Sequence, residues 1–201
     1  METFDAIYQR RAVKHFDPEH ELSEGDIDKL MEATIQSPTS FNMQNWRFVL
    51  VRDQELRQQI KAAANDQAQV TEASLLIVLT ADLKAWEKSP ARYWQNAPTD
   101  VAELLVNWMK PFYEGKDQLQ RDEAMRSCGI AGQTIMLAAK SMGLDSCPMI
   151  GFDAVKVGEL INLPEDHTIG FMIAVGKATQ EAWPKPGQLP LEEVLVQDRF
   201  N

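Results

Sequence analysis

Hydrophobic side chains recur at helical spacing between residues 23 and 37. Ser23 is suited to cap the first turn, and acidic residues follow it, where the helix dipole favours negative charge. The apolar positions of this face are Ile27, Leu30, Met31 and Ile35. Because Pro38 cannot continue a helix, the pattern predicts an amphipathic helix that ends before it.

Three short segments have the composition of strands instead. They are Arg47 to Val51, Leu75 to Thr80 and Thr168 to Val175. The second is almost continuously apolar, which indicates a strand buried on both faces of a sheet.

Three helices of moderate length are predicted between and after these strands. Asp53 and Asp153 occupy cap positions, so we expect helices from there to about Ala64 and to Ile161. Residues 84–116 mix six aromatic side chains with three prolines, and their most helical part is from about Thr99 to Met109.

The strongest helical pattern runs from Asp122 to Met142 and is closed by Gly143. Small residues are concentrated in it, namely Gly129, Ala131, Gly132, Ala138 and Ala139. Since glycine weakens a helix, they indicate that another backbone packs closely against this one. The alternative is an alanine-rich helix with two tolerated glycines.

The chain changes character after Gly176. Prolines and a glycine punctuate the segment 184–190, and an apolar stretch follows, comprising Leu191, Val194, Leu195 and Val196. Such a tail cannot form a core alone, so we expect it to lie on another surface, such as a second subunit. We therefore predict a single domain over 1–201, with a C-terminal arm at about 179–201.

The composition fits this organisation. The 201 residues are 44% apolar and 25% charged, as in an ordinary globular domain. No run approaches the ~20 apolar residues of a membrane span. The first residues lack the basic and apolar regions of a secretory signal, so we expect a cytoplasmic protein.

The net charge argues against a nucleic-acid partner, and the cysteine and histidine content argues against a metal site. The net charge of −10 repels polyanions, so nucleic acid is not an expected partner. The two cysteines and three histidines form no cluster with metal-ligand spacing, so no metal site is expected; they are Cys128, Cys147, His15, His20 and His167.

Three segments could carry chemistry. Arg10 to Lys14 places three cations within five residues, which suits a phosphate, although a solvated patch is the alternative. Ser37 to Trp46 is dense in hydroxyl and amide groups that can hydrogen-bond a heteroaromatic edge or a ribityl chain, although a capped loop is equally compatible. Asp145 to Asp153, expected as a connection between helices, contains Gly151, which lets a backbone approach a flat ligand.

The sequence lacks several common catalytic motifs. It has no GxGxxG, Walker lysine loop, GxSxG or HExxH. Dinucleotide folds, phosphate-loop enzymes, serine hydrolases and zincins therefore lose support.

Taken together and in order, the three segments resemble the nitroreductase family of FMN-dependent oxidoreductases. Arg10 to Phe16 is similar to the basic N-terminal signature of the family, and Ser37 to Trp46 to its Ser-Pro-Ser-x-x-Asn-x-Gln-x-Trp loop. Gly143 to Phe152 resembles its Gly-Leu-x-x-x-Pro-x-x-Gly-Phe segment. Gly176 to Ala178 and Pro184 to Val194 resemble its C-terminal close, so the resemblance covers nearly the whole chain.

The resemblance implies an α+β fold with a mixed, mostly antiparallel sheet flanked by helices. It also implies a homodimer with two shared FMN sites, and a C-terminal tail that extends onto the partner subunit. The implied cofactor is FMN, with NADH or NADPH as the electron donor. The implied acceptor is a small planar electron-poor molecule such as a nitroaromatic, quinone or enone.

The resemblance also implies roles for particular residues. Lys14 would lie beside the N1/O2 edge of the flavin and stabilise the negative charge of its reduced form. The cofactor-binding residues would be Arg10, Arg11, Ala12, Lys14, Pro38, Thr39, Ser40, Asn42, Gln67, Gln69, Pro148, Met149, Ile150, Gly151, Lys185 and Gln188. The substrate channel would be formed by Phe41, Trp94, Trp108 and Phe112, with the aromatic segment acting as a lid or, alternatively, as a plain core helix.

Two positions depart from the pattern of some family members. Ile150 replaces a glutamate, so no polar side-chain contact is expected there. Gln188 stands near the place of a second phosphate-binding arginine, which leaves Arg10, Arg11 and Lys185 to balance a phosphate charge of about −1.5 to −2.

The implied reaction is ping-pong, because donor and acceptor would occupy the same open face of the flavin in turn. Two alternatives stay open from the sequence. One is a dimer that binds FMN without turnover, as a store or sensor. The other is a specialised relative that dehalogenates aromatic compounds or fragments the flavin.

Overall fold

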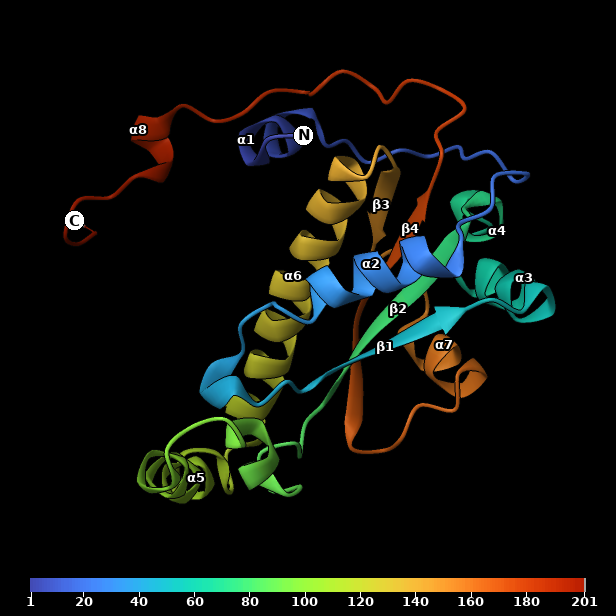
Figure 1. Ribbon diagram of the computed structural model, residues 1–201. Coiled ribbons are helices and arrows are strands. Elements are labelled where there is room, and N and C mark those ends of the chain that lie inside the picture. Colours follow the sequence, from blue (N-terminus) through green and yellow to red (C-terminus); the bar gives the residue numbers. More distant parts are fainter. Residues whose placement is uncertain (201) are drawn as a thin grey trace.

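An antiparallel sheet of four strands forms the centre of the computed structural model, which describes residues 1–200 (Figure 1). The spatial order is β1-β2-β4-β3, and each neighbouring pair is antiparallel. The strands are β1 (Trp46–Val51), β2 (Leu75–Asp82), β3 (Asp145–Met149) and β4 (His167–Gly176).

Helices cover both faces of this sheet. The α-helices are α1 (Thr3–Gln9), α2 (Glu24–Thr34), α3 (Gln54–Ala63), α4 (Gln69–Glu72), α5 (Thr99–Tyr113), α6 (Asp117–Ser141), α7 (Ala154–Leu160) and α8 (Leu191–Val194). Short 3-10 turns are η1 (Ser40–Asn42) and η2 (Pro90–Trp94). None of the helices within residues 1–200 is at once long and apolar enough to cross a bilayer.

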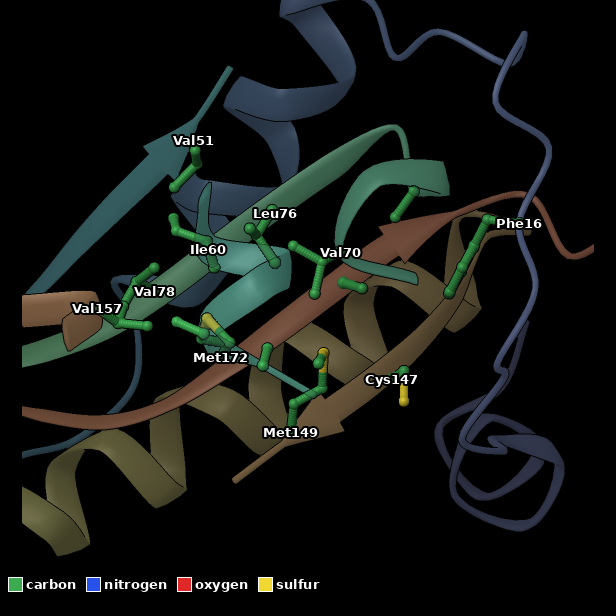
Figure 2. Close-up of a cluster of buried hydrophobic side chains, with 14 of the residues drawn as sticks. Phe16, Val51, Ile60, Val70, Leu76, Val78, Cys147, Met149, Val157 and Met172 are labelled. Atoms are coloured by element: carbon green, nitrogen blue, oxygen red, sulfur yellow. The ribbon is translucent and has the colours of Figure 1, made fainter. Parts of the chain in front are cut away.

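The alternation of side chains along β2 separates two cores. Leu76 and Val78 point into a cluster with residues of α3, α4 and α7, part of which is shown in Figure 2. Leu75 and Ile77 point to the opposite face, where α2 and α6 pack. Every residue of β2 is buried, which confirms the prediction of a strand covered on both faces.

The predicted helix starts are confirmed by their capping bonds. Ser23 Oγ accepts from the Asp26 amide at 3.1 Å, and Asp53 Oδ1 accepts from the Leu56 amide at 2.7 Å. Asp153 Oδ1 accepts from two amides at the start of α7. α2 ends at Thr34, earlier than the pattern predicted, because a tighter turn precedes Pro38.

Several boundaries and elements differ from the prediction. The expected connection at residues 145–153 is wrong, since 145–149 form the edge strand β3. An edge strand tolerates Pro148, which cannot donate to a neighbouring strand. α5 continues through Pro111 to Tyr113, α6 begins five residues before Asp122, and α1 and α4 were not predicted.

The small residues of α6 have a different role from the one expected. A Cβ on Gly132 would lie 2.1 Å from the ring of Phe171, so that glycine accommodates a side chain of β4 and not a backbone. In return, a Cβ on Gly170 would lie 2.7 Å from Cβ of Cys128 on α6. Gly129 has no such neighbour among the described residues. α6 and β4 therefore interlock through one glycine on each.

The tail after Lys177 is exposed along most of its length. It passes α1 and leaves the sheet, as Figure 1 shows in red. Its attachments to its own chain include Thr179 N to His15 O at 3.2 Å and Lys185 Nζ to Tyr8 O at 2.9 Å. The apolar residues around α8 are exposed, including Leu191 and Leu195.

Candidate functional site

A cavity of about 700 Å³ lies where the N-terminal segment, the C-terminal tail and α6 meet. This volume is within the range of about 300–1,000 Å³ that small-molecule sites occupy. Six of the predicted cofactor-binding residues line it, namely Arg10, Arg11, Ala12, Lys14, Lys185 and Gln188.

The edge strand holds the N-terminal part of this cavity in place. The amide of Val13 donates to Ser146 O at 3.1 Å, and Ala12 and Ser146 form a parallel bridge. Val13 itself is buried in the core, so its neighbours on either side are directed outward. Ala12 and Lys14 thus reach the cavity from a backbone that β3 fixes.

Four cations of this cavity have no acidic partner. Within residues 1–200, no carboxylate lies within 4 Å of the charged nitrogens of Arg10, Arg11, Lys14 or Lys185. Arg11 and Lys185 donate to the carbonyl of Tyr8 instead, at 3.4 and 2.9 Å. Glu181 also lines the cavity but forms no ion pair with these four cations, and a cationic cluster without ion pairs on a chain of net charge −10 is suited to an anion such as a phosphate.

Amide side chains connect the other predicted segments. Gln69 Nε2 donates to Gln67 Oε1 at 3.0 Å, and Gln67 Nε2 donates to Gly151 O at 3.0 Å. The same Gln69 amide reaches Cys147 Sγ at 3.9 Å, and Lys14 Nζ reaches that sulfur at 3.4 Å. These contacts place Lys14, both glutamines and the strand β3 in one continuous set of polar groups.

Side chains at the end of β3 and just after it differ in exposure. Met149 is buried, whereas Ile150 is 83% exposed. Pro148, which follows Cys147 and precedes Met149 on the edge strand, is half-buried. The exposed Ile150 offers an apolar surface beside Gly151.

The loop from Pro38 to Gln44 does not line this cavity in the same chain. The amide of Ser40 donates to Glu123 Oε1 at 3.2 Å. Glu123 is ten residues from Gln133 of the cavity wall, which is about 15 Å along α6. One chain therefore does not bring the hydroxyl-rich loop to the cationic cluster.

The loop has an unusual backbone. Phe41, Asn42 and Gln44 have φ of 52°, 50° and 45°, in the left-handed region that non-glycine residues seldom adopt. Side chains hold it there: Thr39 Oγ1 accepts from the Gln44 amide at 2.9 Å, and Asn42 Nδ2 donates to Tyr93 O at 2.7 Å. Strain that the surroundings maintain in this way is common at ligand sites.

The predicted channel residues are near one another but are not equally exposed. The rings of Phe41 and Phe112 have centroids 5.4 Å apart. Trp108 and Phe112 are exposed on α5, at 55% and 43%. Trp94 is half-buried and packs on a third apolar cluster with Tyr93 and Met109, so it has more of a core position than the other two.

A second group of titratable side chains lies at the far end of β2. Asp82, Asp166 and His167 converge there. Lys88 Nζ contacts Asp82 Oδ2 at 2.8 Å and Asp166 Oδ2 at 2.5 Å, so one ammonium bridges both carboxylates. Lys88 and His167 hold the pKa of Asp166 below its ordinary value. We interpret the cluster as a structural one that holds the segment after β2 in place.

Sequence reasoning assigned no role to several residues of the cavity. Tyr8, His15, Gln133 and Trp183 line it, and Cys147 contacts Lys14. Cys147 and Lys14 are far apart in the sequence, so only the fold brings them together. Gln133 lies on the exposed side of α6, and this helical phase is the one signal that could have indicated it.

Comparisons with known proteins agree on one family. The model of the nitroreductase family matches residues 7–177. The chain is 59% identical over 200 residues to protein DrgA of Synechocystis sp., covering 97% of this chain and 95% of that protein. It is 33% identical over 186 residues to an oxygen-insensitive NADPH nitroreductase of Helicobacter acinonychis, covering 89% of each.

A solved structure extends this likeness to the fold. A Staphylococcus epidermidis protein, whose provisional name is NAD(P)H:FMN oxidoreductase, superposes with a TM-score of 0.90. It has 25% sequence identity, and the match covers 98% of this chain and 95% of that one.

Proposed function

Because the chain belongs to the nitroreductase family, we propose that it is an FMN-dependent oxidoreductase that takes hydride from NADH or NADPH and reduces a small planar acceptor. Relatives named NADPH nitroreductase and NAD(P)H:FMN oxidoreductase support this donor and this cofactor. The acceptor class includes nitroaromatics, quinones and enones, all of which are flat and electron-poor.

The observation that carries the proposal is the cluster of unpaired cations in the cavity. Arg10, Arg11 and Lys185 would hold the phosphate of FMN, whose charge of about −1.5 to −2 they can balance. Gln67 and Gln69 offer amide groups to the polar edge of the ring or to the ribityl chain. The donor set thus fits a phosphorylated flavin better than a neutral aromatic ligand.

FMN supplies hydride chemistry when it is bound, and the protein provides binding and electrostatics. Lys14 holds a positive charge that no carboxylate within residues 1–200 neutralises, and a cation of this kind stabilises a ligand that gains negative charge. The exposed rings on α5, Trp108 and Phe112, offer a flat apolar surface for the acceptor. Since one open face would serve donor and acceptor in turn, we expect ping-pong kinetics.

The site requires a second copy of the chain. Ser40 and Asn42 are remote from the cationic cavity of their own chain, and a homodimer would supply them from the partner subunit. Exposed apolar residues are available for the contact on α1 and on the tail: Phe4, Ile7, Tyr8, Leu191, Val194, Leu195 and Val196. We propose that the tail lies on the partner.

The first test compares FMN with riboflavin, which lacks the phosphate. We expect FMN to bind tightly and riboflavin at least about tenfold more weakly, because a charge-assisted phosphate contact contributes about 1.5–3 kcal/mol. Equal affinities, measured by quenching of flavin fluorescence, would contradict the assignment of the cations to a phosphate.

The second test separates a reductase from a flavin store or sensor. We expect NADH or NADPH to bleach the yellow FMN-loaded protein anaerobically, and an added quinone or nitroaromatic to restore the colour. A loaded protein that stays yellow with both donors would favour the store.

A further inference from the structure

Cys147 lies next to the wall of the cationic cavity, where it contacts Lys14. Its residue is fully buried on β3, and Lys14 Nζ donates to its sulfur at 3.4 Å. Gln69 Nε2 approaches the same sulfur at 3.9 Å. In Figure 2, Cys147 is at the margin of the apolar cluster, with its sulfur directed away from the labelled aliphatic side chains.

The Cys147 thiol links the Lys14 ammonium to the amide side chain of Gln69. Lys14 is on an exposed stretch of backbone, and a long lysine side chain without a partner would sample many rotamers. The sulfur is anchored, since β3 pairs with β4 on one side and with Ala12 on the other. A contact with it therefore restricts where the ammonium can be.

The protonation state of Cys147 matters for the charge of the cavity. Burial raises the pKa of its thiol, although Lys14 and Gln69 act in the opposite direction. The sulfur also donates to Pro148 O at 3.7 Å, and this bond requires the proton. A neutral thiol orients the ammonium without cancelling its charge, whereas a carboxylate at this place would cancel it.

We propose that Cys147 is a positioning residue that holds the Lys14 ammonium toward the flavin and leaves its positive charge available to the reduced form. The proposal rests on the proposed function, in which FMN occupies the cavity. It differs from a plain packing role, because packing requires only the volume of the sulfur and not its contact with Lys14.

The test measures how strongly each variant prefers reduced over oxidised FMN. The Kd of oxidised FMN is obtained from fluorescence quenching, and the midpoint potential from anaerobic equilibration with a reference dye. Lys14→Ala should lower the preference about tenfold, the usual effect of losing one interaction with a charged group. For a two-electron couple, tenfold corresponds to about 30 mV.

Cys147→Ala should produce most of the same loss, and Cys147→Ser should restore much of it, since a hydroxyl can also accept from the ammonium. In the double variant Lys14→Ala/Cys147→Ala, the loss should equal that of Lys14→Ala alone, because the two residues act through one contact. Cys128→Ala is the matched control. Cys128 is equally buried but packs against Gly170 on the other face of the sheet.

The outcomes are distinguishable. If Cys147→Ala leaves the preference unchanged while Lys14→Ala lowers it, the positioning role is wrong and the proposed function stands. If Cys128→Ala lowers it as much as Cys147→Ala, the effect is general core damage, and the positioning role is again wrong. If the wild-type protein binds no FMN, or Lys14→Ala has no effect, the assignment of Lys14 fails and the role of Cys147 fails with it.

Discussion

The hydroxyl of Tyr113 donates a hydrogen bond to Ser40 Oγ over 2.8 Å, and this bond joins the end of α5 to the strained loop. Tyr113 is completely buried, and burial raises the pKa of its hydroxyl, so the group stays a donor at neutral pH. The loop that we assign to the partner's flavin site is therefore coupled to the helix that carries the acceptor surface.

Tyr113→Phe should lower the free energy of unfolding by about 1 kcal/mol and also weaken FMN binding, because the loop loses a support for its left-handed backbone. Tyr93→Phe is the control. Its hydroxyl is also hydrogen-bonded, to Ala85 O at 3.2 Å, but does not contact the loop. Equal FMN affinities in the two variants would show that the Ser40 bond has only a structural role.

Removing a phosphate ligand should affect FMN but not riboflavin. Arg10→Ala and Lys185→Ala should each weaken FMN binding by about 1.5–3 kcal/mol, since each loses a charge-assisted contact. Titrations with both flavins report the difference. A variant that weakens riboflavin to the same extent would indicate that the residue contacts the ring or the ribityl chain.

Truncation after Ala178 should remove dimerisation and FMN together. The shared-site proposal makes binding and association one linked equilibrium, so a folded monomer should be colourless. Light scattering coupled to gel filtration gives the mass, and the ratio of visible to ultraviolet absorbance gives the occupancy. A truncated protein that stays dimeric with full FMN would refute the shared site.

Substitution of two tryptophans near the channel by leucine should have different effects. Trp108→Leu should change the ratio of kcat/KM between a quinone and a nitroaromatic at constant Tm, because Trp108 is 55% exposed. Trp94→Leu should lower Tm, because Trp94 packs on a buried cluster. If Trp108→Leu only lowers Tm, α5 is a structural helix and not a lid.

The stability of the fold should decline at alkaline pH partly through Cys128. Burial raises the pKa of its thiol to about 12, from an ordinary value of 9.0. The protonated thiol is thus favoured in the folded state. Its contribution to the free energy of unfolding is complete below about pH 9 and is lost as the pH rises toward 12. Between these pH values, Cys128→Ala should reduce the slope of the free energy of unfolding against pH by up to about 1.4 kcal/mol per pH unit. Urea melts at several pH values measure this slope. Identical slopes would exclude the contribution.

The sequence predicted those elements whose signals are local. Ser23, Asp53 and Asp153 identified helix starts through one side chain each, and the run at β2 identified a buried strand through its composition. The strand β3 was not predicted, because Pro148 and the polar residues around it are atypical of strands and because its partners are distant in sequence. α1 escaped because only Ala6 of its residues is buried, so it has no apolar face of the usual width.

The features of the candidate site likewise divide into those with a local signal in the sequence and those without one. Arg10, Arg11 and Lys14 were suggested by their density of charge, and Gly151 by its type. The contact of Lys14 with Cys147 has no signal in either segment, since it depends on the pairing of Ala12 with Ser146. Trp94 and Trp108 look alike in sequence, yet differ in exposure because α5 turns one of them outward.

The reciprocal packing of Gly132 on Phe171 and of Gly170 on Cys128 prevents α6 from sliding along β4 or rotating against it. Mutations near Arg10 therefore cannot be transmitted to Ser40 as a shift of the helix between them. Through α6, cofactor affinity and acceptor choice are then separate, and the bond of Tyr113 to Ser40 is the contact that still couples them. A single scaffold could acquire new acceptors by changes at exposed positions of α5, such as Trp108 and Phe112, while Tyr113 and the other residues that retain the flavin stay as they are.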